Sequence, residues 1–237
     1  MNGFFDFLAD IPPYEDSPTV IDRLNKRHEM FIAPFAEEIA GARVLDLAAH
    51  DGRWSHAFAG AGAREVTGIE GRQELVDRYA HYPSPELKAH VSLRTGDIFD
   101  GMEDLVKAGE TFDVVGVLGI FYHIMDHFRL LRLASLLKPK LIIIDSEFSL
   151  RPGPLIMLSR ERTAKDLNAI EQVEGQETAV IGIPSRAATE VMADVLGYSC
   201  EWLDWEGRRG AARKNLADYY RPERKRRGTC ILRPRRA

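Results

Sequence analysis

Short apolar runs alternate with amphipathic stretches along the chain, and this alternation predicts an α/β fold. The runs that favour strands lie at residues 42–47, 65–69, 90–94, 112–117, 140–145, 199–204 and 228–233. Helical periodicity lies around and between them, at residues 17–39, 52–61, 72–81, 102–108, 126–137 and 185–196. Alternating strands and helices form parallel sheets through right-handed crossovers. The pattern therefore predicts a Rossmann-like, seven-stranded, mostly parallel sheet with helices on both faces.

Two connections are longer than the usual 4–6 or so residues. The first, residues 148–184, follows the fifth strand and contains three prolines. A long segment at the carboxyl edge of a sheet favours a cap or lid over a bound substrate. The second, residues 204–227, joins the last two strands and carries a helical pattern at 211–219.

The first strand leads into the most informative motif. The sequence VLDLAAHDGRWS places Asp46 at the strand end, and VTGIE ends the second strand on Glu70, 24 residues later. An acid at that position accepts hydrogen bonds from ribose hydroxyls in α/β nucleoside pockets. The turn holds Ala48 and His50 with one glycine, Gly52, so it lacks the glycines that a dinucleotide pyrophosphate requires. A ligand of adenosine joined to an amino acid suits this turn better.

These segments, LDLAAHDGRWS and VTGIEGR, resemble the first two motifs of the class I S-adenosylmethionine-dependent methyltransferases. The third segment, LRTGDIF, resembles the adenine-binding motif of that family. The resemblance implies seven strands with the last one antiparallel, and S-adenosylmethionine as the cofactor. The cofactor-binding residues that we expect are Asp46, Ala48, His50, Gly52, Glu70, Gly71, Asp97, Ile98, Leu118 and Gly119.

The fourth strand runs through LGIFYHI into the place where methyl donor and acceptor should meet. Methyl transfer needs alignment of the acceptor and, in some cases, removal of a proton. Histidine suits that task near neutral pH. We therefore predict His123 as the general base, with His127 and Tyr122 as the other candidates. A role for His123 in the pocket wall alone is an equal alternative.

Substrate-binding candidates surround the same edge. Glu147 ends the fifth strand, and Tyr122 is expected to face the acceptor. Arg151 and Arg160, in the long connection, are candidates to clamp an acidic group, because guanidinium binds carboxylate in a planar fork. Surface positions for these arginines are the alternative. Asp145 with Glu147 offers oxygen ligands of the kind that Mg²⁺ prefers, but strand-edge carboxylates that orient a substrate are commoner, and we predict no metal site.

We expect one domain over residues 1–237. Its parts are an N-terminal helical segment (1–40), a cofactor-binding core (41–147), a substrate lid (148–184) and a C-terminal helix with a strand pair and a basic loop (185–237). The net charge of −4 divides into +10 for residues 207–237 and −14 for residues 1–206. Such a split is typical either of a patch for an anionic partner or of a solvated surface.

The chain has no apolar run of the roughly 20 residues that a membrane helix needs, and its first residues do not resemble a signal peptide. We therefore expect a cytoplasmic protein without membrane contact. Two cysteines, Cys200 and Cys230, are too few for a disulfide framework, and we expect buried thiols. The sequence does not indicate an oligomeric state.

Three functions fit these observations. The leading hypothesis is an S-adenosylmethionine-dependent methyltransferase that acts on an oxygen or nitrogen atom of a small molecule or short peptide. The alternative is an RNA-modifying enzyme of the tRNA type, which transfers a methyl or carboxymethyl group and uses the basic segment to bind phosphates. A non-enzymatic module that retains the nucleoside pocket is the third. The acceptor atom and the choice between S-adenosylmethionine and its carboxylated form stay open.

Overall fold

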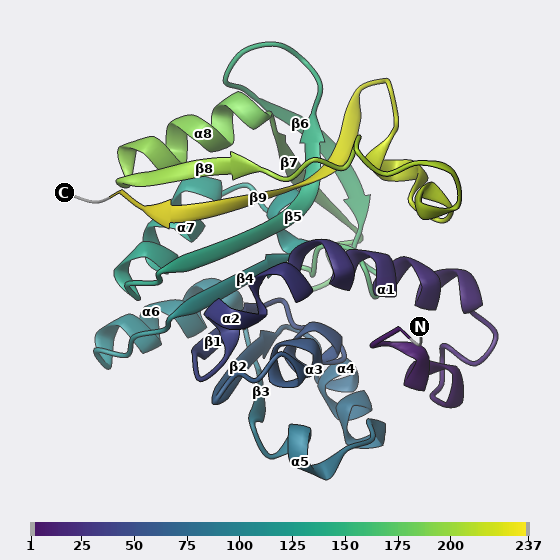
Figure 1. The fold of residues 1–237 in the computed structure, drawn as a ribbon. Helices are drawn as coiled ribbons and strands as arrows, with labels where there is room; N and C mark the ends of the chain where they lie inside the picture. The colour runs from purple at the N-terminus through teal and green to yellow at the C-terminus, as the bar shows by residue number, and fades with distance from the viewer. Residues whose placement is uncertain (1–2, 236–237) are drawn as a thin grey trace.

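A seven-stranded sheet forms the centre of the computed structural model, which describes residues 3–235 (Figure 1). The strand order is β3-β2-β1-β4-β5-β9-β8, and β9 is antiparallel to both of its neighbours. This confirms the predicted fold class. The strands are β1 (Arg43–Leu47), β2 (Glu65–Glu70), β3 (Val91–Thr95), β4 (Val114–Leu118), β5 (Leu141–Ser149), β6 (Ile156–Arg162), β7 (Thr178–Pro184), β8 (Tyr198–Trp202) and β9 (Lys225–Pro234).

Helices cover both faces of the sheet because alternate strand residues point to opposite sides. Val44, Val66 and Val114 pack with α1, α2 and α3, whereas Leu45 and Val115 pack with α6 and α7. The α-helices are α1 (Pro18–Phe31), α2 (Ala36–Ile39), α3 (Arg53–Gly60), α4 (Gln73–Arg78), α5 (Pro85–Lys88), α6 (Ile98–Lys107), α7 (His127–Leu136) and α8 (Arg186–Val195). Short 3₁₀ helices are η1 (Asp6–Asp10), η2 (Ala33–Phe35), η3 (Tyr79–His81), η4 (Ile120–Tyr122), η5 (Gly210–Arg213) and η6 (Ala217–Tyr219).

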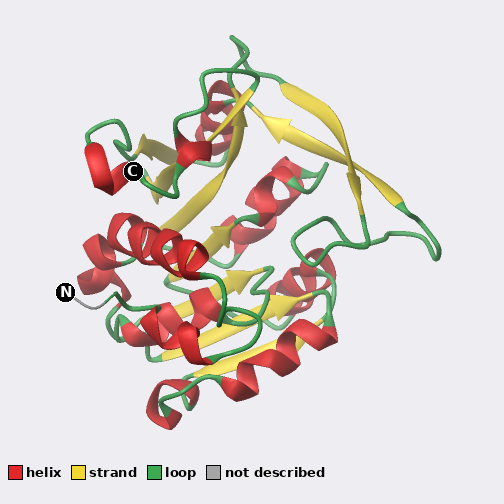
Figure 2. Cartoon of the chain, turned by 90° about the vertical axis from the view of Figure 1, so that its right-hand side faces the viewer, coloured by secondary structure: helices red, strands yellow, loops and turns green. Residues whose placement is uncertain are grey.

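The long connection after β5 folds into a two-stranded antiparallel hairpin, β6–β7, which the strand pattern had missed. Its residues alternate between exposed and half-buried along β6, the pattern of a ribbon with one face toward the protein. Figure 2 shows the hairpin standing off the main sheet, with the loop at its far end reaching toward the layer of β1 to β3. The hairpin therefore carries the 163–177 loop to the carboxyl edge of the sheet.

Other boundaries differ from the sequence prediction. The first predicted helix, 17–39, is α1 followed by a 3₁₀ turn at Pro34 and the short α2. The predicted helix at 211–219 is two separate 3₁₀ turns, η5 and η6. Asn215, between them, has a left-handed φ of 63°, which ends a right-handed helix. No helix within residues 3–235 is long and apolar enough to cross a membrane.

The sheet register places the residues of the first motif. Asp46 on β1 lies between Gly68 on β2 and Gly116 on β4. Glu70 ends β2 beside Thr95, the last residue of β3. Because all four strands are parallel, their carboxyl ends form one edge, and the residues after them are brought together there.

Candidate functional site

The turn after β1 places two residues other than glycine in the left-handed backbone conformation, which normally favours glycine. Ala48 and His50 have left-handed φ angles of 56° and 55°, and Gly52 has a φ of 78°. Left-handed backbone costs about 1–2 kcal/mol for a residue with a Cβ atom. A Cβ at Gly52 would also lie 2.6 Å from the ring of Tyr79. Strain of this kind persists at functional sites where the surrounding structure holds it.

Asp46 presents an unsatisfied carboxylate oxygen at this turn. Its side chain is buried, and Ser55 Oγ donates a hydrogen bond of 2.7 Å to Oδ2. Among the described residues, Oδ1 has no hydrogen-bond partner. Burial raises the pKa of Asp46 to about 7, with a further contribution from the nearby charge of Glu70. A buried acceptor without a partner fits a cationic donor supplied by a ligand.

Glu70 is buried at the end of β2 and closes the turn from the other side. Its Oε2 accepts a hydrogen bond of 2.8 Å from the backbone N–H of His50, and its Oε1 accepts one of 3.1 Å from that of Arg72. Each carboxylate oxygen can accept more than one hydrogen bond. The carboxylate therefore positions the turn and still has acceptor capacity for a ligand.

The N-terminal segment covers the same turn. The Tyr14 hydroxyl donates to Asp51, and Arg53 donates to Asp51 with 2.7 Å between Nε and Oδ1. Arg53 Nη2 also lies 2.5 Å from His50 Nδ1. Burial alone would raise the pKa of Asp51, but Arg53 holds it well below its usual range. This buried ion pair keeps the turn rigid.

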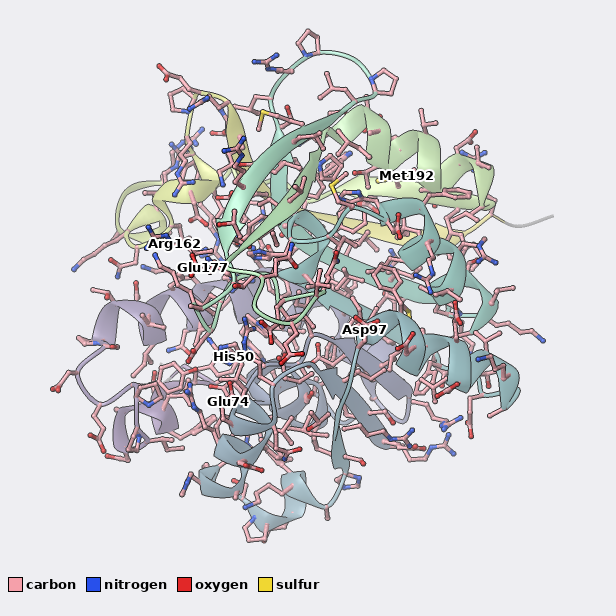
Figure 3. All side chains as sticks on the ribbon, turned by 180° about the vertical axis from the view of Figure 1, so that it is seen from behind. His50, Glu74, Asp97, Arg162, Glu177 and Met192 are labelled. Carbon is pink, nitrogen blue, oxygen red and sulfur yellow. The ribbon has the colours of Figure 1, made fainter. Side chains whose placement is uncertain are left out.

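Asp97 and Ile98 follow β3, as the motif predicts, and Asp97 has a structural task there. It is the N-cap of α6, and its Oδ1 accepts from the backbone N–H groups of Phe99 at 2.7 Å and Asp100 at 3.2 Å. Its side chain is exposed, while Ile98 is buried. In Figure 3, Asp97 and His50 lie on the same face of the molecule but are well separated. Leu118 is buried at the end of β4, and Gly119 follows with a φ of 135°.

His123 forms a pair with a carboxylate of the hairpin. Its Nδ1 lies 2.5 Å from Glu161 Oε2, and the same oxygen accepts a hydrogen bond of 2.8 Å from the backbone N–H of Ala169. Burial tends to raise the pKa of Glu161, but the hydrogen bond and charge of His123 bring it below its usual range. The ring of Tyr122 lies 3.8 Å from that of His123, centroid to centroid. Tyr122 and His123 thus lie together beyond the carboxyl end of β4.

His127 is not brought to this place. It is buried at the start of α7, where Nδ1 lies 2.9 Å from the carbonyl oxygen of Met125 and Nε2 lies 3.0 Å from that of Gly182. Burial lowers the pKa of His127. Both ring nitrogens face backbone oxygens, so neither is placed to take a proton from a substrate. Its contacts fix β7 to α7.

The loop between β6 and β7 lies on the turn after β2. The Arg72 guanidinium donates hydrogen bonds to four backbone carbonyls of this loop, and Ile170 packs over Gly71, 3.0 Å from where a Cβ would stand. In Figure 3, Arg162 and Glu177, at the far end of the hairpin, lie above His50 and Glu74. The carbonyls belong to Thr163, Lys165, Asp166 and Asn168.

The predicted substrate residues are distributed differently from the expectation. Glu147 is buried at the end of β5 and pairs with Arg221, at 2.9 Å, and with Lys225. Arg151 and Arg160 are exposed. Arg160 is on the outward face of β6, because Ser159 and Glu161 occupy the inward positions next to it. The structure does not bring these two arginines to the edge where His123 lies.

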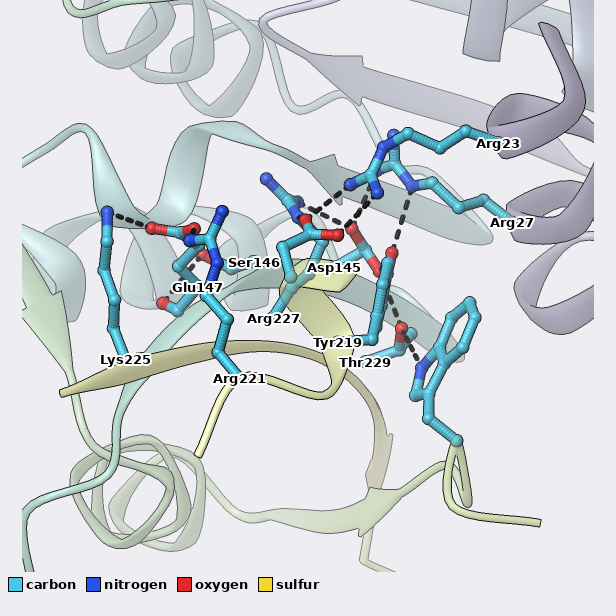
Figure 4. Close-up of polar contacts among 12 residues, drawn as sticks. Arg23, Arg27, Asp145, Ser146, Glu147, Tyr219, Arg221, Lys225, Arg227 and Thr229 are labelled. Carbon is cyan, nitrogen blue, oxygen red and sulfur yellow. Dashed lines mark hydrogen bonds and ion pairs between the residues drawn. The ribbon is translucent and has the colours of Figure 1, made fainter. Parts of the chain in front are cut away.

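Asp145 is the centre of a buried ionic network (Figure 4). It accepts hydrogen bonds of 2.6–2.8 Å from Arg27, Arg227, Tyr219 and Thr229. Burial would raise the pKa of Asp145, but Arg27 and Arg227 lower it. Both carboxylate oxygens are occupied by protein donors, and no group of three potential metal-ligating side chains occurs within residues 3–235. This network ties α1 and the C-terminal segment to β5.

Two site residues had escaped the sequence prediction. Glu161 and Arg72 act through segments that are remote in the sequence, 38 and 91 or more residues from their partners. The sequence of residues 156–162, IMLSRER, does not alternate between apolar and polar side chains, so only the burial pattern of the folded strand identifies Glu161 as an inward residue. The hydrogen bonds from Arg72 to the backbone carbonyls of the loop could not be predicted, because backbone acceptors are the same for every residue type.

No family model matches the chain. A curated relative, a tRNA U34 carboxymethyltransferase of Pseudomonas aeruginosa, is 31% identical over 170 residues, which are 68% of this chain and 46% of the relative. The chain thus spans about half the length of the curated relatives it matches.

Solved structures share the fold. The N-terminal domain of EvdMO1, crystallised in the presence of SAH and D-fucose, is 20% identical with a TM-score of 0.61 and covers 92% of this chain and 83% of its own. A putative S-adenosylmethionine-dependent methyltransferase from Listeria monocytogenes is 13% identical with a TM-score of 0.59, covering 89% of this chain and 98% of its own. An S-adenosylmethionine-dependent methyltransferase from Mesorhizobium loti is 16% identical with a TM-score of 0.55, and the match covers 84% of this chain and 96% of that one. The chain therefore shares the α/β fold of these methyltransferase structures.

Proposed function

We propose that this chain is an S-adenosylmethionine-dependent methyltransferase that acts on a small molecule. The observation that carries the proposal is Asp46 Oδ1, a buried acceptor without a partner among the described residues, at the end of β1 in this fold. Asp46 would receive the ammonium group of the cofactor, and Glu70 would accept hydrogen bonds from its ribose hydroxyls. Ile98 would pack against the adenine, with Leu118 and Gly119 beside the sulfonium.

When bound, the cofactor supplies a methyl group on a sulfonium, which leaves as a thioether after in-line attack. The protein then needs to align the acceptor and remove its proton. In the neutral tautomer with the proton on Nδ1, His123 would donate to Glu161, whose Oε2 lies 2.5 Å away, and keep a lone pair on Nε2. His123 would use this nitrogen as the general base, with Glu161 as the positioning residue. Because Glu161 is on the hairpin, the base would be oriented only when the hairpin is in place.

The loop of residues 163–177 would act as the lid over this site. Its carbonyls bind Arg72, two residues after Glu70, and its Ala169 N–H binds the carboxylate that orients His123. The closed arrangement therefore links the ribose side of the site to the acceptor side. A lid that excludes water favours transfer to a small acceptor.

The charge distribution supports a small molecule over RNA as the acceptor. Of the eleven lysines and arginines that the structure describes from residue 207 to residue 235, eight pair with carboxylates, which include Glu29, Glu38, Asp145, Glu147 and Asp194. Binding of RNA phosphates would have to compete with these ion pairs. The basic segment is therefore largely neutralised by the acidic remainder of the chain.

The second candidate is carboxymethyl transfer to tRNA. It is favoured by the Pseudomonas aeruginosa relative, although the match covers 46% of that protein. This function predicts binding to tRNA with a steep salt dependence, because each neutralised phosphate releases counterions. A small acceptor predicts no such dependence.

Two experiments test the proposal. Mass spectrometry of the ligand released from purified protein should find S-adenosylmethionine or S-adenosylhomocysteine, and calorimetry should detect binding of S-adenosylhomocysteine. Transfer of label from S-adenosylmethionine or from its carboxylated form, each offered to a small-molecule extract and to bulk tRNA, then separates the two acceptor classes. Label in tRNA alone would overturn the small-molecule assignment. Absence of any cofactor binding would overturn the methyltransferase assignment.

With the acceptor in hand, His123→Ala should lower turnover by about 10²–10⁴, the range expected for a lost general base. Affinity for S-adenosylhomocysteine should stay unchanged. Glu161→Gln should weaken turnover less and shift the pH at which it falls, because the amide no longer supplies the negative charge beside His123. Full activity in His123→Gln would mean that this residue only fills space.

A further inference from the structure

A groove of about 470 Å³ lies between the β6–β7 hairpin and the turn that leads into β9. One wall is apolar and is made by Met157, Leu158 and Ile183. The other wall carries cationic side chains, Arg224 and Lys225 among them. A cavity of this size fits a small organic ligand, for which pockets of about 300–1,000 Å³ are usual.

The strands that line the groove also carry or contact the residues proposed for catalysis. Met157 and Ser159, which line it, occupy inward positions of β6, and Glu161 is the next inward position on the same strand. Glu161 contacts His123. On the other wall, Lys225 Nζ lies 5.6 Å from the centre of the Tyr122 ring. Strand β6 therefore connects the groove to His123 through Glu161, and Lys225 at the start of β9 connects it to Tyr122.

The cations of the groove differ in their partners. Arg221 and Lys225 share the carboxylate of Glu147 (Figure 4). Arg224 is exposed and forms no ion pair with any other residue of the 3–235 range. Its backbone is held in place, because its carbonyl oxygen accepts a hydrogen bond of 2.9 Å from the N–H of Leu150 and its φ is 58°. A left-handed residue with a long charged side chain is uncommon, and here it places on the groove a cation that forms no ion pair, although Glu223 also lines the groove.

We propose that this groove binds the acceptor substrate, and that the acceptor is a small molecule with an anionic group and an apolar body. Arg224 holds the carboxylate or phosphate of the ligand, because guanidinium binds either group through paired hydrogen bonds. The apolar body lies on Met157, Leu158 and Ile183. This inference rests on the proposed function for the reaction. Binding of an anion in the groove can be tested independently of that function.

The arginines predicted to bind an acidic group of the substrate, which belong to the insert after β5, do not take part in the groove. Arg151 and Arg160 of the insert are exposed and do not line the groove. The cations come from the connection between β8 and β9, which the β5–β9 pairing brings against the hairpin through Lys225 and Ser149. The insert contributes the apolar wall, and the C-terminal connection contributes the charge.

The test uses three probes of similar shape on the intact chain, in the presence of S-adenosylhomocysteine. Benzoate and phenyl phosphate carry the anion, and benzamide is the neutral counterpart. Calorimetric or ligand-detected NMR titration should give at least about tenfold tighter binding for one or both anions than for benzamide. The preferred anion distinguishes a carboxylate acceptor from a phosphorylated one.

Arg224→Asn is the variant of choice, because asparagine tolerates left-handed φ better than most residues. It should remove most of the preference for the anions and leave affinity for S-adenosylhomocysteine unchanged. Lys214→Gln is the matched control: it removes one charge from the same connection at an exposed position outside the groove. This control should bind the probes as the wild type does.

Equal affinity for benzoate, phenyl phosphate and benzamide would overturn the proposal, as would unchanged anion binding in Arg224→Asn. An equal loss in Arg224→Asn and Lys214→Gln would also overturn it, because diffuse surface charge would then explain the binding. If S-adenosylhomocysteine does not bind the wild type, the proposed function fails. The titration without it still decides whether the groove takes an anion.

Discussion

Asp46 offers the sharpest test of the cofactor site, because its carboxylate is both buried and incompletely paired. We predict that binding of S-adenosylhomocysteine becomes stronger as pH rises through about 7, and that Asp46→Asn removes this dependence. Asparagine has nearly the same shape, and its side-chain carbonyl can still accept the hydrogen bond from Ser55 Oγ. The variant therefore removes the charge with little change in packing.

The magnitude follows from the pKa of about 7 for Asp46 in the chain without ligand. At pH 6 about one tenth of the Asp46 side chains are ionised, and at pH 8 about nine tenths are. A ligand ammonium prefers the ionised form, so affinity should rise about tenfold between these pH values, which is about 1.4 kcal/mol. Binding at pH 6 should release close to one proton per molecule bound, and binding at pH 8 almost none.

The same pKa has an opposite effect on the stability of the unliganded chain. The folded-state pKa of Asp46 lies above its usual value of 3.8, so the native chain holds this proton more tightly than the unfolded chain does. The resulting stabilisation is present at low pH and is lost as pH rises through about 7. Asp46→Asn should lack this loss. Urea unfolding of both proteins at several pH values measures the difference.

The assay is isothermal titration calorimetry at pH 6, 7 and 8 in buffers with different ionisation enthalpies, which reports the number of protons released. Asp113→Asn is the control, because Asp113 lies next to the first residue of β4, at the opposite edge of the sheet, where it pairs with Lys140. This control should retain the wild-type pH dependence. A wild-type affinity that does not vary from pH 6 to pH 8 would refute the assignment of Asp46 to the ammonium.

Three further predictions concern residues around this site. Glu70→Ala should weaken S-adenosylhomocysteine binding by about 1–3 kcal/mol, because ribose donors lose their acceptor; unchanged affinity in calorimetry would contradict the assignment. Arg72→Gln should raise the hydrogen exchange rate of residues 163–170, since the guanidinium holds their carbonyls; an unaltered exchange pattern would argue against the lid contact. Asp145→Asn should lower the free energy of unfolding by about 3–5 kcal/mol, because buried Arg27 and Arg227 lose their counter-charge; a loss below about 1 kcal/mol in urea unfolding would show that the network is not stabilising.

The ends of the first two strands were predictable because they depend on local order. An apolar strand, a turn with one glycine and a helix place Asp46 at the sheet edge, and Glu70 follows at the end of the next parallel strand. Parallel strands bring their carboxyl ends together whatever the rest of the chain does. The positions of Asp46 and Glu70 at one edge of the sheet were therefore predicted before any contact was known.

Local spacing was less informative where one residue type serves two roles. Asp97 follows β3 as the adenine motif predicts, yet an aspartate at that position is also a good helix N-cap, and it caps α6. His123 and His127 are four residues apart. His123 contacts Glu161 of β6, while both ring nitrogens of His127 face backbone carbonyl oxygens. Only packing distinguishes them.

The sequence by itself determined the mostly parallel core, the turn after β1 and the two acids beside it, because these depend on hydrophobic period and on the geometry of neighbouring parallel strands. The tertiary structure alone decided which side chains surround His123 and which line the groove. The hairpin brings Glu161 to His123, and β9 brings Arg224 to the groove in place of the arginines of the insert. These contacts join residues remote in the chain, and side-chain packing and charge pairing across that distance leave no periodic signal in the sequence.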